Sequence, residues 1–71
     1  MAPEKLAYMA NQIGRFFASQ KPETAVDGIV DHLLKFWDPR MRRTLAAHVD
    51  DAGLALDPPV RQAVMRLRQT L

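Results

Sequence analysis

The sequence predicts a small all-α protein, a bundle of about four short helices that forms a single domain over residues 1–71. Two observations carry this prediction. Five prolines divide the chain into segments, and apolar residues recur within each segment at a period of about 3.6 residues. Proline is favoured at the first position of a helix, where its missing N–H has no partner to lose. We therefore expect helices over residues 3–19, 22–36, 39–52 and 58–70.

The first expected helix carries one apolar stripe when each residue is rotated by about 100° around the axis. The residues of this stripe are Leu6, Met9, Ile13, Phe16 and Phe17. Tyr8 points to nearly the opposite side, beside the polar residues Asn11 and Arg15, so Tyr8 is a candidate for contact with a partner. Residues 1–8 are also a candidate variable extension at the N-terminus.

The second expected helix is apolar over about half of its circumference, which is wider than one packing seam requires. Its apolar residues are Ala25, Val26, Ile29, Val30, Leu33, Leu34, Phe36 and Trp37. Either this helix is the central element that all the others touch, or part of its stripe contacts a partner. Both alternatives stay open, and Phe36 and Trp37 are included among the candidate interface residues.

Two Asp-Pro pairs mark the starts of the last two helices. Asp38 precedes Pro39 and Asp57 precedes Pro58. An aspartate at this position can accept hydrogen bonds from backbone N–H groups two or three residues further on. We therefore expect Asp38 and Asp57 to be helix N-caps. Gly53 is expected to end the third helix in the left-handed conformation.

The last two helices each have an expected buried face. It comprises Met41, Leu45, Val49 and Ala52 in the third helix, and Val60, Ala63, Val64, Leu67 and Leu71 in the fourth. On the far side of the fourth helix, Arg61, Met65 and Arg68 form a ridge. Methionine and arginine are enriched in protein interfaces, so these three residues join the candidate partner surface.

Positive charge is concentrated in the second half of the chain. The formal net charge is +2, and from Asp38 onward the chain contains arginine but no lysine. Arg40, Arg42 and Arg43 lie at the start of the third expected helix, where each cation opposes the helix dipole by about 0.3–1 kcal/mol. Only Asp38 is close to them in sequence. We expect these arginines to face an acidic or cofactor-bearing partner, although arginine-rich codon usage explains the same bias.

Residues that carry chemistry are sparse. The absence of cysteine excludes disulfides and thiolate metal sites. His32 and His48 have no ligand partner one helical turn away. Asp27 and Asp31 share the polar face of the second helix, where two solvated carboxylates are the simpler interpretation. Since three scattered glycines cannot form a phosphate loop, we expect no catalytic, cofactor-binding or metal site in this chain.

Nucleic-acid and membrane binding are the remaining classes. A sequence pI of about 9.5 and the arginines near residue 40 favour nucleic acid. The modest charge of +2 and the absence of lysine after Lys35 argue against it. No stretch approaches the roughly 20 apolar residues of a membrane span, and the first residues lack a signal-peptide pattern. We expect a cytoplasmic protein whose small core is stabilised by a protein partner.

Three segments resemble a known family in the same order and over nearly the whole chain. They are Met9-Ala-Asn-Gln-Ile-Gly-Arg-Phe-Phe17, Lys35-Phe-Trp-Asp-Pro-Arg-Met-Arg42 and Leu56-Asp-Pro-Pro-Val-Arg61. The chain resembles the delta subunits of NAD-dependent formate dehydrogenases. The string from Phe36 to Met41 is the most specific part of the resemblance.

The resemblance implies a non-catalytic accessory subunit of a cytoplasmic complex. The partner is expected to be the large (alpha) subunit, with the delta subunit supporting its assembly, stability or cofactor loading. The resemblance also implies that other subunits carry a molybdenum (or tungsten) pterin cofactor, iron–sulfur clusters, FMN and NAD. The alternative is a free-standing helical chaperone or adaptor that leaves the complex after maturation. A small nucleic-acid-binding domain is the less favoured alternative.

Overall fold

The computed structural model describes residues 2–70, which form four α-helices and no strand. The helices are α1 (Pro3–Gln20), α2 (Ala25–Phe36), α3 (Pro39–Ala47) and α4 (Pro58–Arg68), with a single 3-10 turn η1 (Pro22–Thr24) before α2. The predicted all-α class with four helices is confirmed. The second helix begins at Ala25, three residues later than predicted, because residues 22–24 form the 3-10 turn. Leu71, which was expected in the core, lies outside the described residues.

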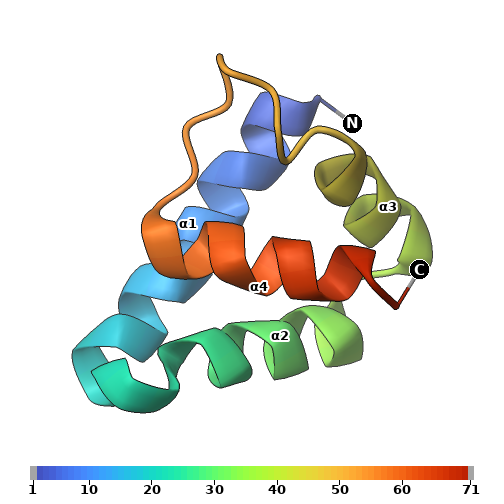
Figure 1. Cartoon of the computed structure of the whole chain (residues 1–71). Helices are drawn as coiled ribbons and strands as arrows, with labels where there is room; N and C mark the ends of the chain where they lie inside the picture. Colours follow the sequence, from blue (N-terminus) through green and yellow to red (C-terminus); the bar gives the residue numbers. More distant parts are fainter. Residues whose placement is uncertain (1, 71) are drawn as a thin grey trace.

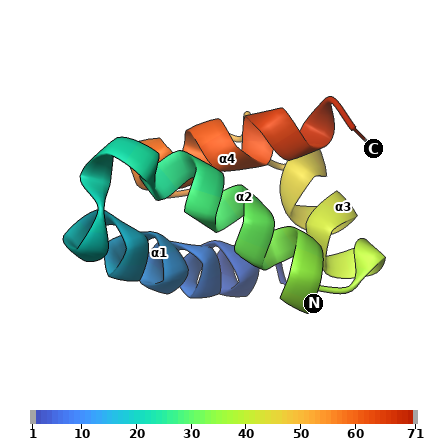
Figure 2. The same ribbon diagram turned by 90° about the horizontal axis from the view of Figure 1, so that it is seen from below.

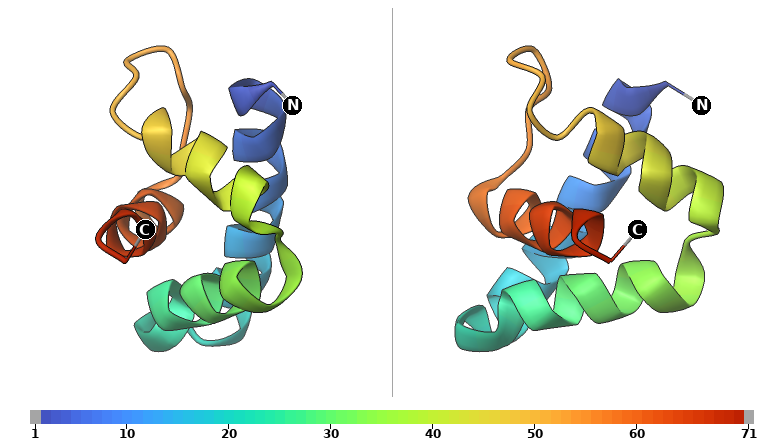
Figure 3. Two further views of the ribbon diagram at one scale, coloured as in Figure 1. Left: turned by 90° about the vertical axis from the view of Figure 1, so that its right-hand side faces the viewer. Right: turned by 45° about the vertical axis from the view of Figure 1, so that its right-hand side comes forward.

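The helices α1 and α2 form a V that is closed at one end by η1 (Figure 1). At the open end α3 bridges the two arms, and α4 packs across them, in contact with α1, α2 and α3 (Figures 2 and 3). Each helix therefore has a side toward the centre of the V and a side away from it. The core fills the centre.

The core draws on all four helices. Trp37 belongs to it, with only 6% of its surface exposed. The structure therefore selects the packing alternative for Trp37 and removes it from the candidate partner surface. The buried cluster comprises Leu6, Ala7, Ala10, Ile29, Leu33, Trp37, Leu45, Ala46, Val49, Val60, Ala63, Val64 and Leu67.

The buried face of α1 differs from the expected stripe. Small residues line it, and Met9 and Phe16 from the expected stripe are exposed instead. A methyl group added at Gly14 would collide with the side chain of Val60, so the missing side chain lets α4 approach α1 closely. Compared with the expected orientation, α1 is rotated about its axis, so that its large apolar residues lie toward the outer flank that it shares with α2. The residues buried in α1 are Leu6, Ala7, Ala10, Asn11 and Gly14.

The third helix ends at Ala47, five residues before the predicted end. Arg61 of α4 donates a hydrogen bond from Nη1 to the carbonyl oxygen of Val49, 2.7 Å away, which satisfies an acceptor that continued helix would have used. Gly53 does not provide the expected left-handed cap, because no glycine within residues 2–70 has a positive φ. The contact from α4 lies outside what local sequence rules describe.

Candidate partner-binding surface

The turn between α2 and α3 is held by Asp38. Its Oδ1 accepts a hydrogen bond from the backbone N–H of Met41 at 2.9 Å, and its own backbone is extended. The expected N-cap at Asp38 is therefore confirmed. The cap and the ring of Pro39 together define how α3 leaves the end of α2.

Arg42 is a structural residue rather than a surface cation. Its Nη1 donates to the carbonyl oxygens of Leu33 and Leu34, each at 3.3 Å, and to that of Trp37. These carbonyls lie at the C-terminal end of α2, where that of Leu33 also accepts from the backbone N–H of Trp37. A cation is stabilised there by the negative end of the helix dipole. The expectation that the arginines near residue 40 have few partners within the chain was wrong for Arg42, because the carbonyls come from the end of the preceding helix.

Asp57 occupies the N-cap position of α4, but its side chain accepts no capping hydrogen bond. The carboxylate instead forms an ion pair with Arg15, with 3.2 Å between Nε and Oδ2. Its backbone N–H donates to Oδ1 of Asn11 at 2.9 Å, while Nδ2 of Asn11 donates to the carbonyl oxygen of Ala55 at the same distance. Asp57 therefore has the predicted N-cap position, but the predicted side-chain hydrogen bond was wrong. The placement of Asn11 on the polar side of α1 was also wrong, because Asn11 is buried.

The ridge on α4 is neutralised by a carboxylate from the loop after α3. Asp50 lies 3.3 Å from Arg61 and 2.7 Å from Arg68, measured between oxygen and guanidinium nitrogen. The hydrogen bond and charge of Arg68, followed by those of Arg61, lower the pKa of Asp50. Met65 is 38% exposed beside this pair. The ridge is thus at the surface, but its two cations already have an anion within the chain.

Four further candidate interface residues, two aromatic and two cationic, are exposed. Tyr8 is 63% exposed and Phe36 is 73% exposed. Arg40 and Arg43 are exposed on α3, and neither forms an ion pair with any residue from 2 to 70. These four residues keep their place on the candidate surface.

A row of rings extends from Phe36 across α2 onto α1, and sequence reasoning missed it. His32 lies 4.7 Å from Phe36 and 6.1 Å from Phe17, and Phe17 lies 5.3 Å from Phe16, measured between ring centroids. We call these four residues the aromatic row. Phe16 is 59% exposed. Helical periodicity predicted Phe16 and Phe17 to be core residues. The sequence feature that indicated a further exposed apolar surface was the excess width of the apolar stripe on α2.

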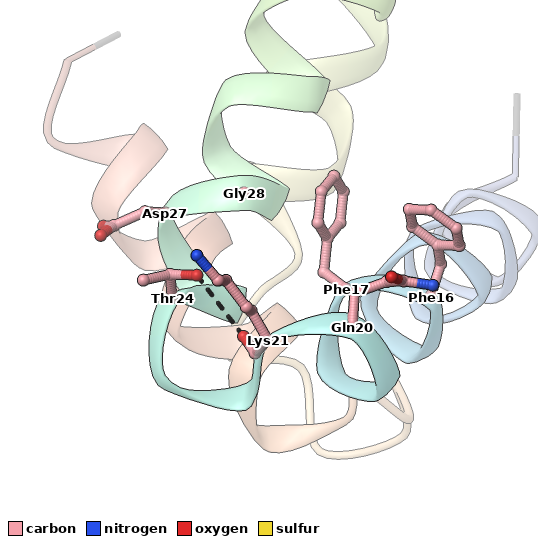
Figure 4. Close-up of a pocket in the computed structure, with 7 residues that line it drawn as sticks. All are labelled: Phe16, Phe17, Gln20, Lys21, Thr24, Asp27 and Gly28. Carbon is pink, nitrogen blue, oxygen red and sulfur yellow. Dashed lines mark hydrogen bonds between the residues drawn. The ribbon is translucent and has the colours of Figure 1, made fainter.

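Two adjoining hollows accompany the aromatic row along the outer flank of α1 and α2. The first is lined by Phe16 and Phe17 together with the η1 turn and the first turn of α2 (Figure 4). The second is lined by Gln12, Ile13, Phe16, Phe17 and His32. No residue of α3 or α4 lines either hollow, so both open away from the core.

One comparison with known proteins gave a match. The family model described as NADH-dependent formate dehydrogenase delta subunit FdsD matches residues 5–64. The chain belongs to this family. The comparisons with curated proteins and with solved structures gave no significant match. The matched range in this delta subunit family covers the whole aromatic row, Arg40 and Arg43, and ends before Met65 and Arg68 of the ridge.

Two aspartates and one histidine that the sequence offered for chemistry pair with other side chains in this delta subunit family member. Asp27 pairs with Arg66, and Asp31 pairs with Lys35 at 3.0 Å, so the two carboxylates do not pair with each other. His48 Nδ1 lies 2.6 Å from Asp51. Within residues 2–70, no group of three or more metal-ligating side chains is assembled, and no helix has the length and apolar character that a bilayer span requires.

Proposed function

We propose that this chain is a non-catalytic accessory subunit of a cytoplasmic NAD-dependent formate dehydrogenase, which binds the large subunit and supports its assembly, stability or cofactor loading. The observation that carries the proposal is the family match over residues 5–64. The proposal assigns the molybdenum or tungsten pterin cofactor, the iron–sulfur clusters, FMN and NAD to the other subunits.

The chemistry of the chain supports a binding role. It contains no cysteine, so it has no thiolate with which to hold an iron–sulfur cluster. Its conspicuous polar side chains are used for its own fold: Arg42 on the end of α2, Asn11 on the loop before α4, and Asp50 between two arginines. The exposed features include apolar rings and, within residues 2–70, two arginines of α3 that form no ion pair, and such residues are typical of contact surfaces.

Co-purification from native extract tests the proposal. A tagged copy of the chain is expected to elute with the mature, cofactor-containing enzyme at one copy per large subunit. A strain that lacks the chain is expected to lose formate-dependent NAD reduction, and supplying the chain should restore it. Formate oxidation by the isolated chain would contradict the non-catalytic role, and absence of the large subunit from the eluate would contradict the binding role.

The same experiment separates a permanent subunit from an assembly chaperone. A chaperone should elute only with immature large subunit, which a metal analysis of each fraction identifies by its missing molybdenum or tungsten. A permanent subunit should elute with fractions that contain the full complement of metal. Arg42 bears on the nucleic-acid alternative, because its guanidinium bonds to backbone carbonyls. Of the three arginines near residue 40, this leaves Arg40 and Arg43 for phosphate contacts.

A further inference from the structure

We propose that the aromatic row, together with Arg40 and Arg43, is the surface that binds the large subunit, and that it receives an amphipathic helix with carboxylates beside its apolar face. This inference rests on the proposed function, because it names the contact surface for the same partner. It also departs from the ridge on α4, which had the more conspicuous composition in the sequence.

The aromatic row is a continuous stretch of exposed and half-buried apolar surface. Isolated apolar residues are common on protein surfaces, whereas a contiguous set marks a contact site. Met65 is isolated between two arginines that are paired with Asp50. Phe36 and Phe16 are the two most exposed phenylalanines, and they are linked by His32 and Phe17 through ring-to-ring contacts. Ile13 and Met9 extend the apolar surface along α1, with Ile13 half-buried and Met9 exposed.

The spacing of the rings in the aromatic row is close to the rise of one helical turn. The three centroid distances along the aromatic row lie between 4.7 and 6.1 Å. An α-helix advances about 5.4 Å per turn, so a helix that presents one apolar side chain per turn can place these side chains against the exposed edges and faces of the rings at a matching spacing. The hollows beside Phe17 lie along the same line and provide space for such side chains.

Two positively charged side chains follow the end of the aromatic row in sequence. The aromatic row ends at Phe36, the last residue of α2, and α3 begins three residues later with Arg40 and Arg43 in its first turns. Both cations lie in the first two turns of α3, where the positive end of the helix dipole disfavours them. The N-cap carboxylate of Asp38 forms no ion pair with either of them. Elsewhere the chain pairs its own arginines with aspartates, as Arg61 and Arg68 are with Asp50. Carboxylates from the partner complete the corresponding arrangement at Arg40 and Arg43.

The test measures binding of purified variants to the large subunit within the complex from which the chain is missing. Phe16→Asp and Phe36→Asp should each weaken binding at least about 30-fold, as substitution of an interface hot spot does. Met65→Asp is the matched control, with a similar change at an exposed apolar residue on α4, and should bind within a few-fold of the parent. A thermal melt of each variant checks that the fold is retained.

A charge series tests the second half of the surface. Arg40→Glu combined with Arg43→Glu should weaken binding by a similar factor, and raised salt should weaken the parent but have less effect on this variant. The conservative pair Arg40→Lys and Arg43→Lys retains the charges and should keep most of the affinity. Light scattering of the parent and of Phe36→Asp, without the complex, is expected to give the same monomer mass.

Each contrary result has a distinct meaning. Normal binding by folded Phe16→Asp and Phe36→Asp, with a parent that binds, overturns this inference and leaves the proposed function standing. A parent that does not bind the complex overturns both. A stable dimer of the parent that Phe36→Asp dissociates, with binding to the complex unchanged, assigns the aromatic row to a second copy of this chain and also overturns the inference.

Discussion

The two sides of this molecule differ in whether the candidate contact residues are bonded within the chain or remain exposed. On the side of α3 and α4, three of the five arginines that looked available for a partner are engaged within the chain. Arg42 bonds to the end of α2, and Arg61 and Arg68 pair with Asp50. On the side of α1 and α2, Phe16, which looked like a core residue, remains exposed, and Phe17 is only partly buried. Composition suggested the opposite assignment.

The difference teaches that an exposed charge is weak evidence for a contact surface until its neighbours in space are known. Arginine is long and carries five donors, so it readily finds a carbonyl or carboxylate within its own domain. A phenylalanine ring cannot form such bonds, and it is removed from water only when other apolar groups cover it. In a chain of 71 residues, few layers of structure are available to cover a second row of rings.

The largest difference in stability is expected between an aspartate introduced in the core and an aspartate introduced on the exposed aromatic row. Val64 is only 1% exposed, so Val64→Asp buries a carboxylate without a partner and should unfold the domain. Phe16→Asp should leave the helix content unchanged because Phe16 lies at the surface. Circular dichroism of both variants measures the contrast, and a folded Val64→Asp protein would mean that the core is assigned wrongly.

The next comparison uses two neighbours at the end of α2. Trp37 is 6% exposed and Phe36 is 73% exposed. Trp37→Ala should lower the free energy of unfolding by about 3–5 kcal/mol, because it leaves a cavity in the core. Phe36→Ala should change it by less than about 0.5 kcal/mol. Denaturant unfolding of the two variants decides the matter, and equal losses would show that both rings contribute to the core.

A smaller effect is expected at the arginines that begin α3. Arg42→Met keeps much of the apolar stem but removes the donors to the end of α2, and should lower stability by about 1–3 kcal/mol. Arg43→Met removes a cation that has no ion pair within residues 2–70 and should change stability by less than about 0.5 kcal/mol. Thermal melts provide the comparison, which fails if the two losses are alike.

The smallest effect concerns Asp50 and appears only as a pH dependence. Its pKa is lowered by Arg68 and then Arg61 from an ordinary value of 3.8. A carboxyl group whose pKa is lower in the folded state stabilises the fold above its unfolded pKa, and this contribution disappears as pH falls through the folded pKa. Asp50→Asn should therefore melt slightly below the parent at pH 7, and the difference should vanish in strong acid. A difference that persists there would have a cause other than the charge.

The sequence by itself determined the elements of this protein. Four helical segments, the start of α3 at Pro39 and the cap at Asp38 were all predicted correctly. The physical reason is that these features depend on interactions over three or four residues. Proline restricts φ and lacks an N–H, and an aspartate directly before the helix reaches the amides of its first turn.

Only the tertiary structure decided which surfaces are covered and which polar groups find partners. Asn11 bonds to residues 44 and 46 positions away, and Asp50 pairs with arginines 11 and 18 positions away. The rotation of α1 that exposes Phe16 follows from the close approach of Val60 to Gly14. Helical periodicity shows which residues share a face, but it does not show how far a neighbouring helix will cover that face. That coverage depends on how all four helices pack at once.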